Sequence, residues 1–219
     1  ARRQRQMCIR DRAKKVGEQL RLALDFPIQR ATGSIKDLKI GLLTQGSISE
    51  TAARALADLI KDLVESGSTI VLPDNASVIN SATFMERLFE GKQSWSVNLG
   101  YGAHLSSNGC FVMSTPTTST TEIMTGLGAT GVEIILMYTN GIPVASHPLV
   151  PVLQFGAEGE HDEKFMGDLD FVLPQLMDNS SEFLIKHIES TIKQQHVPKL
   201  HHRGYSNFQV TRGAVGVSL

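Results

Sequence analysis

Cysteine is scarce in this 219-residue chain, which contains only Cys8 and Cys110. Two cysteines cannot build the disulfide framework of a small secreted domain, so we expect a reducing compartment and predict a cytoplasmic protein. Cys110 begins an apolar run, which favours a core residue over a nucleophile. The seven histidines show neither the H-x₃-H nor the H-E-x-x-H spacing of a zinc site.

The chain also lacks an excess of charge of either sign and lacks long apolar runs. The formal net charge is −1, so the chain has no strong positive potential that would attract nucleic acid, and we expect no nucleic-acid partner. No apolar run approaches the roughly 20 residues that a membrane-spanning helix needs, so we expect no membrane partner. The composition, with 41% hydrophobic and 20% charged residues, is ordinary for a soluble globular protein.

The first twelve residues, ARRQRQMCIRDR, are strongly basic and have no apolar segment. They therefore do not resemble a secretory signal. We interpret residues 1–12 as a non-native or disordered extension, the alternative being a native basic arm. Residues 13–219 are then expected to form a single α/β domain with an irregular C-terminal tail.

Short apolar runs alternate with amphipathic stretches along most of the chain. This alternation predicts a Rossmann-like α/β fold, with a mostly parallel sheet and helices on both faces. Right-handed crossovers would bring the turns after Leu43, Leu72 and Met113 to one edge of the sheet, where open α/β sheets bind ligands. The predicted strands are 38–43, 69–72, 110–113, 132–138 and 150–155, with a short one near 208–211; the predicted helices are 13–24, 50–65, 78–88, one beginning after Ser119, and 180–195.

Glycines cluster between residues 126 and 131, read as GLGATG. The spacing matches a dinucleotide-binding fingerprint, but the cluster follows a helix and precedes a strand, which is the reverse of the required order. No such fingerprint follows the first strand. We therefore reject a dinucleotide site and interpret Gly128 as the residue that ends the helix in a left-handed conformation.

The turn Ser114–Glu122 is rich in hydroxyl groups and ends in a capping-box pattern, Ser119 to Glu122. A helix N-terminus presents unpaired N–H groups and a partial positive charge, so it can hold a substrate carboxylate. The alternative is that Glu122 only caps the helix. Ser47 and Glu50 show the same capping pattern at the turn after the first strand. The same two interpretations, ligand binding or a cap alone, apply there.

Other polar candidates lie at the second strand and among the histidines. Asp74 and Asn75 follow a strand, where their oxygens suit a hard metal ion or sugar hydroxyls, although an Asx turn explains them equally well. His104 in a long loop and His147 before a strand are the candidates for acid–base chemistry. His187 falls on the buried stripe of a helix and is interpreted as packed.

Several spaced segments together resemble the C-terminal catalytic region of the altronate/galactarate dehydratase family. They are STPTTSTTEIMTGLGATGVEIIL (114–136), GIPVASHPLVPVLQ (141–154), Asp168–Phe171, and a tail with PKL (198–200), Gly204 and NFQVTRGAVGVS (207–218). The resemblance implies dehydration of a sugar acid to a 2-keto-3-deoxy acid, with a divalent metal ion, iron(II) foremost and Mn²⁺ or Mg²⁺ as alternatives.

The resemblance also implies roles for single residues of this chain. Glu122, His147 and His104 become the catalytic candidates, and Asp74 and Asn75 the metal ligands. The substrate-binding candidates are Gly46, Ser47, Thr115, Thr117, Thr118, Gly126 and Gly128. For the small N-terminal domain found in many members, we expect either a separate chain or a loss together with the non-native residues at the N-terminus, and a homo-oligomer stays open.

Two departures from the family pattern bear on activity. Thr44-Gln45-Gly46-Ser47-Ile48 stands where many members have Cys-Gly-Gly-Ser-Asp, and a single acid, Asp74, stands where members often have a glutamate-rich element. The alternative function is therefore a divergent, non-catalytic member that binds a carboxylated ligand or a partner chain. A nucleotide-binding Rossmann protein is a third interpretation, but the first turn supplies no phosphate loop.

Overall fold

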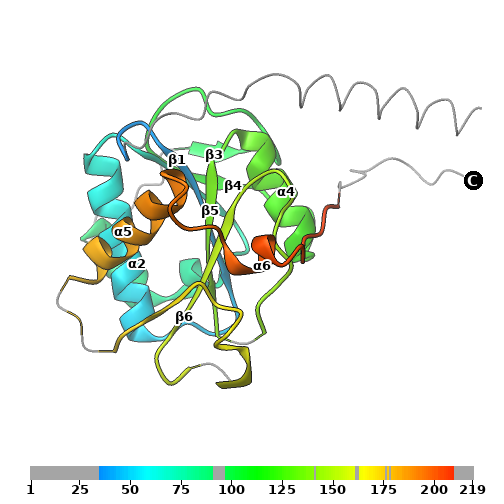
Figure 1. Ribbon diagram of the computed structural model, residues 1–219. Coiled ribbons are helices and arrows are strands. Elements are labelled where there is room, and N and C mark those ends of the chain that lie inside the picture. The colour runs from blue at the N-terminus through cyan, green and yellow to red at the C-terminus, as the bar shows by residue number, and fades with distance from the viewer. Residues whose placement is uncertain are drawn as a thin grey trace, which may run out of the picture. The chain divides into compact units, whose positions relative to one another are not determined.

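All strands of the sheet in the described part of the chain run parallel, in the order β3-β4-β2-β1-β5-β6-β7 (Figure 1). The computed structural model describes residues 35–90, 97–140, 142–160, 163–175, 177 and 179–209. The strands are β1 (Lys39–Gln45), β2 (Thr69–Pro73), β3 (Val97–Leu99), β4 (Cys110–Met113), β5 (Ile134–Thr139), β6 (Val152–Ala157) and β7 (Phe171–Leu173). The predicted Rossmann-like α/β fold is confirmed.

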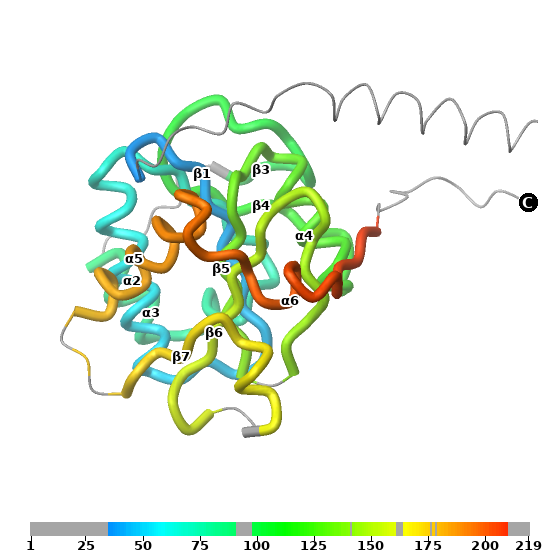
Figure 2. Tube along the Cα trace, viewed as in Figure 1, coloured from blue at the N-terminus to red at the C-terminus, as the bar shows by residue number. Residues whose placement is uncertain are grey.

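Helices cover both faces of the sheet (Figures 1 and 2). Leu42 of β1 packs into the cluster that contains residues of α2 (Glu50–Glu65), α3 (Ala82–Phe89) and α5 (Ser180–Ile192). The next residue, Leu43, packs on the opposite face with α4 (Thr120–Thr130). Successive side chains of a strand point to opposite faces, so a strand covered on both sides is apolar throughout. This explains why the central strands read as unbroken apolar runs.

The helix predicted over 78–88 is divided in two. A short 3₁₀ helix, η1 (Ser77–Asn80), precedes α3, and the break falls at Ser81. Ser81 has an extended backbone, and its hydroxyl accepts a hydrogen bond from the amide of Phe84 at 3.3 Å. A serine that caps a helix in this way ends the preceding turn, so the prediction of one continuous helix over 78–88 was wrong.

The capping predictions were also wrong in detail. Ser49, rather than Ser47, caps α2 by accepting from the amide of Ala52 at 3.2 Å. Ser119 caps α4 without a side-chain hydrogen bond, so no capping box forms with Glu122. The helix continues through Gly128 and ends at Gly131, whose φ of 97° is left-handed. The prediction that Gly128 ends the helix was wrong, because Gly131, three residues later, is the glycine that takes the left-handed conformation.

The C-terminal part holds elements that the sequence did not predict. These are β7, the 3₁₀ helix η2 (Glu163–Phe165) and α6 (Lys199–His202). Earlier in the chain, β3 lies within residues 91–108, the long loop that was predicted to contain His104. Near the predicted 208–211 strand, the described chain forms one parallel bridge, between Ser206 and Ser146. The predicted helix 13–24 and the extension 1–12 lie outside the described residues. In the described part of the chain, no helix has both the length and the apolar character needed to cross a membrane.

Candidate functional site

The carboxyl edge of the sheet changes topology between β1 and β5. The chain leaves β1 toward β2 and β4 on one side, then returns through α4 to β5 on the other. Ligands of open α/β sheets bind in the crevice outside the strand ends at such a point. The turns after β1, β2, β4 and β5 therefore define the candidate site.

The turns after β1 and β5 touch each other. The Asn140 amide, just after β5, donates to the Ser47 hydroxyl at 2.5 Å. Gly46 has a φ of +81°, and a Cβ on it would lie 1.8 Å from the Asn140 side-chain oxygen. Only glycine fits both that backbone conformation and that contact. Gly46 and Ser47 thus lie at the switch point, as expected, with Asn140 as a partner that the sequence analysis missed.

Thr44 stands where the similar dehydratase family has a cysteine, and its side chain makes structural contacts. Its side chain is buried, and its hydroxyl oxygen accepts from the amide of Val78 at 3.0 Å and from the Ser77 hydroxyl at 3.1 Å. These bonds tie the end of β1 to η1. The hydroxyl is therefore turned toward η1 in this structure.

The turns after β2 and β4 also converge. Asp74 Oδ1 accepts from the backbone amide of Thr115 at 3.0 Å and from the Thr115 hydroxyl. The Asn75 side-chain amide donates to the carbonyl of Thr117 at 3.0 Å. Asp74 and Asn75 are exposed, so solvent or a ligand can reach them. Thr118, the residue after Thr117, is exposed as well.

Glu122 lies half-buried in the first turn of α4, with both carboxylate oxygens engaged. Oε2 accepts from the Thr117 hydroxyl, and Oε1 accepts from the Gln209 side-chain amide at 2.9 Å. The Thr117 hydroxyl oxygen also accepts from the amide of Ser119 at 3.1 Å. Its proton is therefore directed to Glu122. Glu122 therefore lies in α4 and is joined by its carboxylate to Thr117 in the turn after β4.

His147 is buried beside α4 and does not open onto the edge. Its Nδ1 accepts from the amides of Leu149 and Val150, each at 3.2 Å, and its Nε2 lies 3.5 Å from the Thr125 hydroxyl. With Nδ1 accepting two bonds, a neutral ring carries its proton on Nε2. Burial lowers the pKa of His147, which favours this neutral form. Its contacts describe a packed ring that shapes the loop before β6.

Three candidates lie away from the carboxyl edge. His104 is exposed next to Gly131, at the end of α4 that precedes β5, and so belongs to the opposite, amino edge. Cβ atoms added to Gly126 and Gly128 would lie 2.4 Å from the Tyr101 ring and 3.2 Å from Val150. These two glycines therefore allow close packing along the body of α4. The structure does not bring His104 to Glu122, whereas Gly126 lies one turn after Glu122 on α4, where the Tyr101 hydroxyl donates to the Glu122 carbonyl at 2.5 Å.

A buried tyrosine and an acid lie at the carboxyl edge, and the sequence analysis missed them. The Tyr138 hydroxyl donates to Glu160, which follows β6. Burial, and next the Glu160 carboxylate, raise the pKa of Tyr138, while hydrogen bonds with Ser49 oppose the rise. Tyrosine in an apolar run reads as core, so only the position of Tyr138 near a strand end could have signalled this pair.

The described donors do not complete the iron site that the resemblance implies. No group of three or more His, Cys, Asp or Glu side chains lies close enough to hold a metal ion within the described ranges. Asp74 brings one carboxylate, with the Asn75 oxygen 3.5 Å from the Thr115 hydroxyl. Such oxygens suit a hard cation, whereas iron(II) sites commonly combine histidine with carboxylate.

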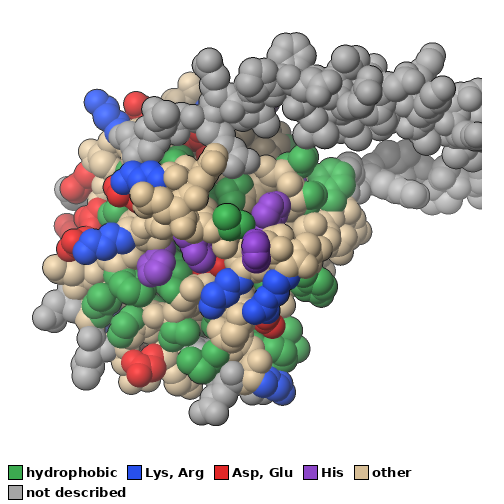
Figure 3. Space-filling model, viewed as in Figure 1, with side chains coloured by type: hydrophobic (Ala, Val, Ile, Leu, Met, Phe, Trp, Pro, Cys, Tyr) green, Lys and Arg blue, Asp and Glu red, His purple; other side chains and the backbone are tan. Residues whose placement is uncertain are grey.

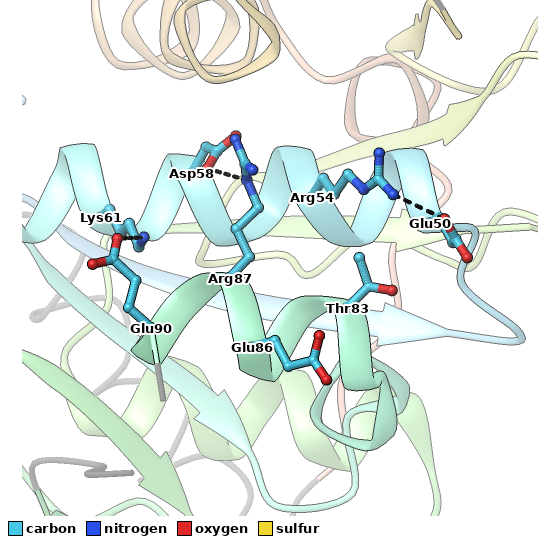
Figure 4. A pocket seen from close by; sticks show the side chains of 8 residues that line it. All are labelled: Glu50, Arg54, Asp58, Lys61, Thr83, Glu86, Arg87 and Glu90. Atoms are coloured by element: carbon cyan, nitrogen blue, oxygen red, sulfur yellow. Dashed lines mark hydrogen bonds and ion pairs between the residues drawn. The ribbon is translucent and has the colours of Figure 1, made fainter. Parts of the chain in front are cut away.

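Two other polar regions lie elsewhere. A groove of about 600 Å³ between α2 and α3 is lined by charged side chains, of which Arg87 pairs with Asp58 at 2.6 Å and Lys61 with Glu90 at 2.5 Å (Figure 4). These pairs join the two helices across the groove. Histidine side chains gather over α5 and α6 (Figure 3), where His187 stacks on Phe171 with ring centroids 4.0 Å apart. His187 is thus packed, as predicted.

A scan with protein-family models and a search of curated proteins each found no match to this chain. The functional assignment therefore depends on the resemblance of the motifs and on the geometry of the carboxyl edge.

Proposed function

We propose that this chain is the larger part of a sugar-acid dehydratase of the altronate/galactarate type. One observation of the site carries the proposal beyond the motif resemblance. Glu122, in the first turn of α4, has its carboxylate held by a donor on each oxygen, beside the turns after β2 and β4. A carboxylate held at a ligand-binding edge is what proton abstraction next to a substrate carboxylate requires.

The reaction assigns a role to each group at the edge. Glu122 keeps a lone pair on each oxygen and would take the proton from the carbon next to the substrate carboxylate. Ser119 leaves the first turn of α4 without a side-chain cap, so the amides there can receive that carboxylate as it becomes an enediolate. The neighbouring hydroxyl then receives the proton that Glu122 has taken and leaves as water, and the resulting enol tautomerises to the 2-keto-3-deoxy acid.

The exposed oxygens of Asp74 and Asn75 fit the hydroxyl-rich remainder of a sugar acid. Carboxylate and amide oxygens accept hydrogen bonds from sugar hydroxyls. Ser47 and Asn140 lie at the switch point across the same edge. A substrate with a carboxylate at one end and several hydroxyls thus finds complementary groups along the edge.

A second function is favoured by the bonds of Thr44. The hydroxyl that stands in place of the cysteine of the similar family is turned into the fold, toward η1. This observation favours a divergent member that binds a carboxylated ligand, or a partner chain, without dehydrating it.

One experiment separates the two functions. The purified protein, with iron(II) or Mn²⁺ and the small N-terminal domain of a related dehydratase supplied, is offered altronate, galactarate and related aldonates. Formation of a 2-keto-3-deoxy acid supports the dehydratase, and Glu122→Gln should then lower kcat by about 10²–10⁴-fold. Glu133→Gln is the matched control, because Glu133 bonds the amide of Lys39 at the amino edge. Binding by calorimetry without any product would support the second function and overturn the first.

A further inference from the structure

The C-terminal segment Tyr205–Gln209, which we call the clasp, crosses the loop before β6 and reaches α4 (Figure 2). Its backbone pairs with Ser146 on both sides: the Ser146 amide donates to the Tyr205 carbonyl at 3.0 Å, and the Asn207 amide donates to the Ser146 carbonyl at 2.8 Å. These two bonds fix the register of the clasp on the loop.

The next residue of the clasp covers the buried histidine. The Phe208 ring meets the His147 ring edge-on, with centroids 5.4 Å apart. His147 in turn lies beside Thr125, which is one turn after Glu122 on α4. The backbone hydrogen bonds to Ser146 and the packing of Phe208 on His147 therefore hold the clasp beside α4 up to the residue before Gln209.

Gln209 bridges two groups at the start of α4. Its amide nitrogen donates to Glu122 Oε1 at 2.9 Å, and its amide oxygen lies 3.4 Å from the Ser119 hydroxyl that donates to it. Thr117 holds the other carboxylate oxygen. Rotation about the last bond of a glutamate is soft, so a donor on each oxygen is needed to fix the plane of the carboxylate.

From this geometry we infer that Gln209 is a positioning residue for Glu122, brought to the site by the clasp. The inference rests on the proposed dehydratase function, in which Glu122 is the base. With Gln209 in place, the free lone pairs of Glu122 keep one direction relative to the substrate carbon. Without it, the carboxylate rotates about the single remaining donor, Thr117, and productive geometry becomes less frequent.

The test compares Gln209→Ala with the control Gln175→Ala, since Gln175 is an exposed glutamine whose amide donates to the carbonyl of Glu158 at 2.9 Å after β7. We expect Gln209→Ala to lower kcat on the order of tenfold with KM within about twofold, and Gln175→Ala to leave both unchanged. Hydrogen exchange at the Asn207 amide should stay as slow as in the wild type, since the clasp remains on Ser146.

Two results would overturn the inference. One is an unchanged kcat in Gln209→Ala. The other is a loss of kcat together with fast exchange at Asn207, because the clasp would then have detached and the effect would be structural. If the wild type forms no product, the proposed function fails instead, and NMR of the Gln209 side-chain amide decides the contact: Glu122→Ala should shift that signal, and an unmoved signal refutes the positioning.

Discussion

Removal of the Asp170 carboxylate should destabilise the fold far more than removal of a neighbouring acid. The Asp170 side chain is only 2% exposed and lies just before β7. Its Oδ2 accepts from the amide of Gln154 at 2.7 Å, and its Oδ1 accepts from the amide of Lys199 at 2.7 Å and faces His196 Nε2 at 3.1 Å. Asp170 therefore ties β6 and α6 to the start of β7.

Asp170→Ala leaves two backbone amides and the His196 ring without this acceptor. Truncating one partner of a buried, hydrogen-bonded charge costs about 3–5 kcal/mol, and we expect a loss in that range. Asp168→Ala is the control, because Asp168 pairs with Arg203 at the surface, where the two side chains are 34% and 53% exposed. An exposed ion pair contributes at most about 1 kcal/mol.

Urea unfolding followed by circular dichroism measures both variants. The midpoint should fall strongly for Asp170→Ala and little for Asp168→Ala, with the slope unchanged in both. Equal losses in the two variants would refute the reasoning, because the buried bonds of Asp170 would then contribute no more than a surface pair.

Three further predictions concern Gly46, Cys110 and His147. Gly46→Ala should cost at least about 1–2 kcal/mol in urea unfolding, since its φ is +81° and its Cβ would meet Asn140; an unchanged midpoint contradicts this. Burial raises the pKa of the Cys110 thiol to about 12. In a Cys8→Ser variant the thiol should therefore react with a disulfide reagent at pH 8 far more slowly in the native than in the unfolded protein, and stability should fall as the pH rises above 9; equal reaction rates in the two states contradict this. Burial lowers the pKa of His147, so the unfolded chain binds the proton first and the free energy of unfolding should fall as the pH falls below 6.5. His147→Gln should make this fall with pH less steep, with the part due to the lowered pKa of His187 remaining, and an equally steep fall in the variant contradicts the prediction.

The candidate site was predictable only where a local pattern marks the end of a strand. Gly46, Asp74 and Thr115 follow apolar runs, so their arrival at one edge follows from the direction of parallel strands. Glu122 was found by its capping pattern, although the cap itself is not formed. His104 was predicted only as a candidate in a long loop, because its distance along the chain from β4 does not show at which edge of the sheet the loop lies.

The α/β class and the parallel sheet could be predicted from the amino-acid sequence, because apolar runs of strand length and amphipathic stretches are local patterns. Which polar groups meet depends instead on the packing of segments that are far apart in the chain. Asn140 reaches Ser47 across 93 residues, and Gln209 reaches Glu122 across 87. The hydroxyl of Thr44 is directed to η1, and the two nitrogens of His147 to the loop and α4. Hydrogen bonds are short-ranged and directional, so their partners depend on how distant segments pack, which a local pattern does not record.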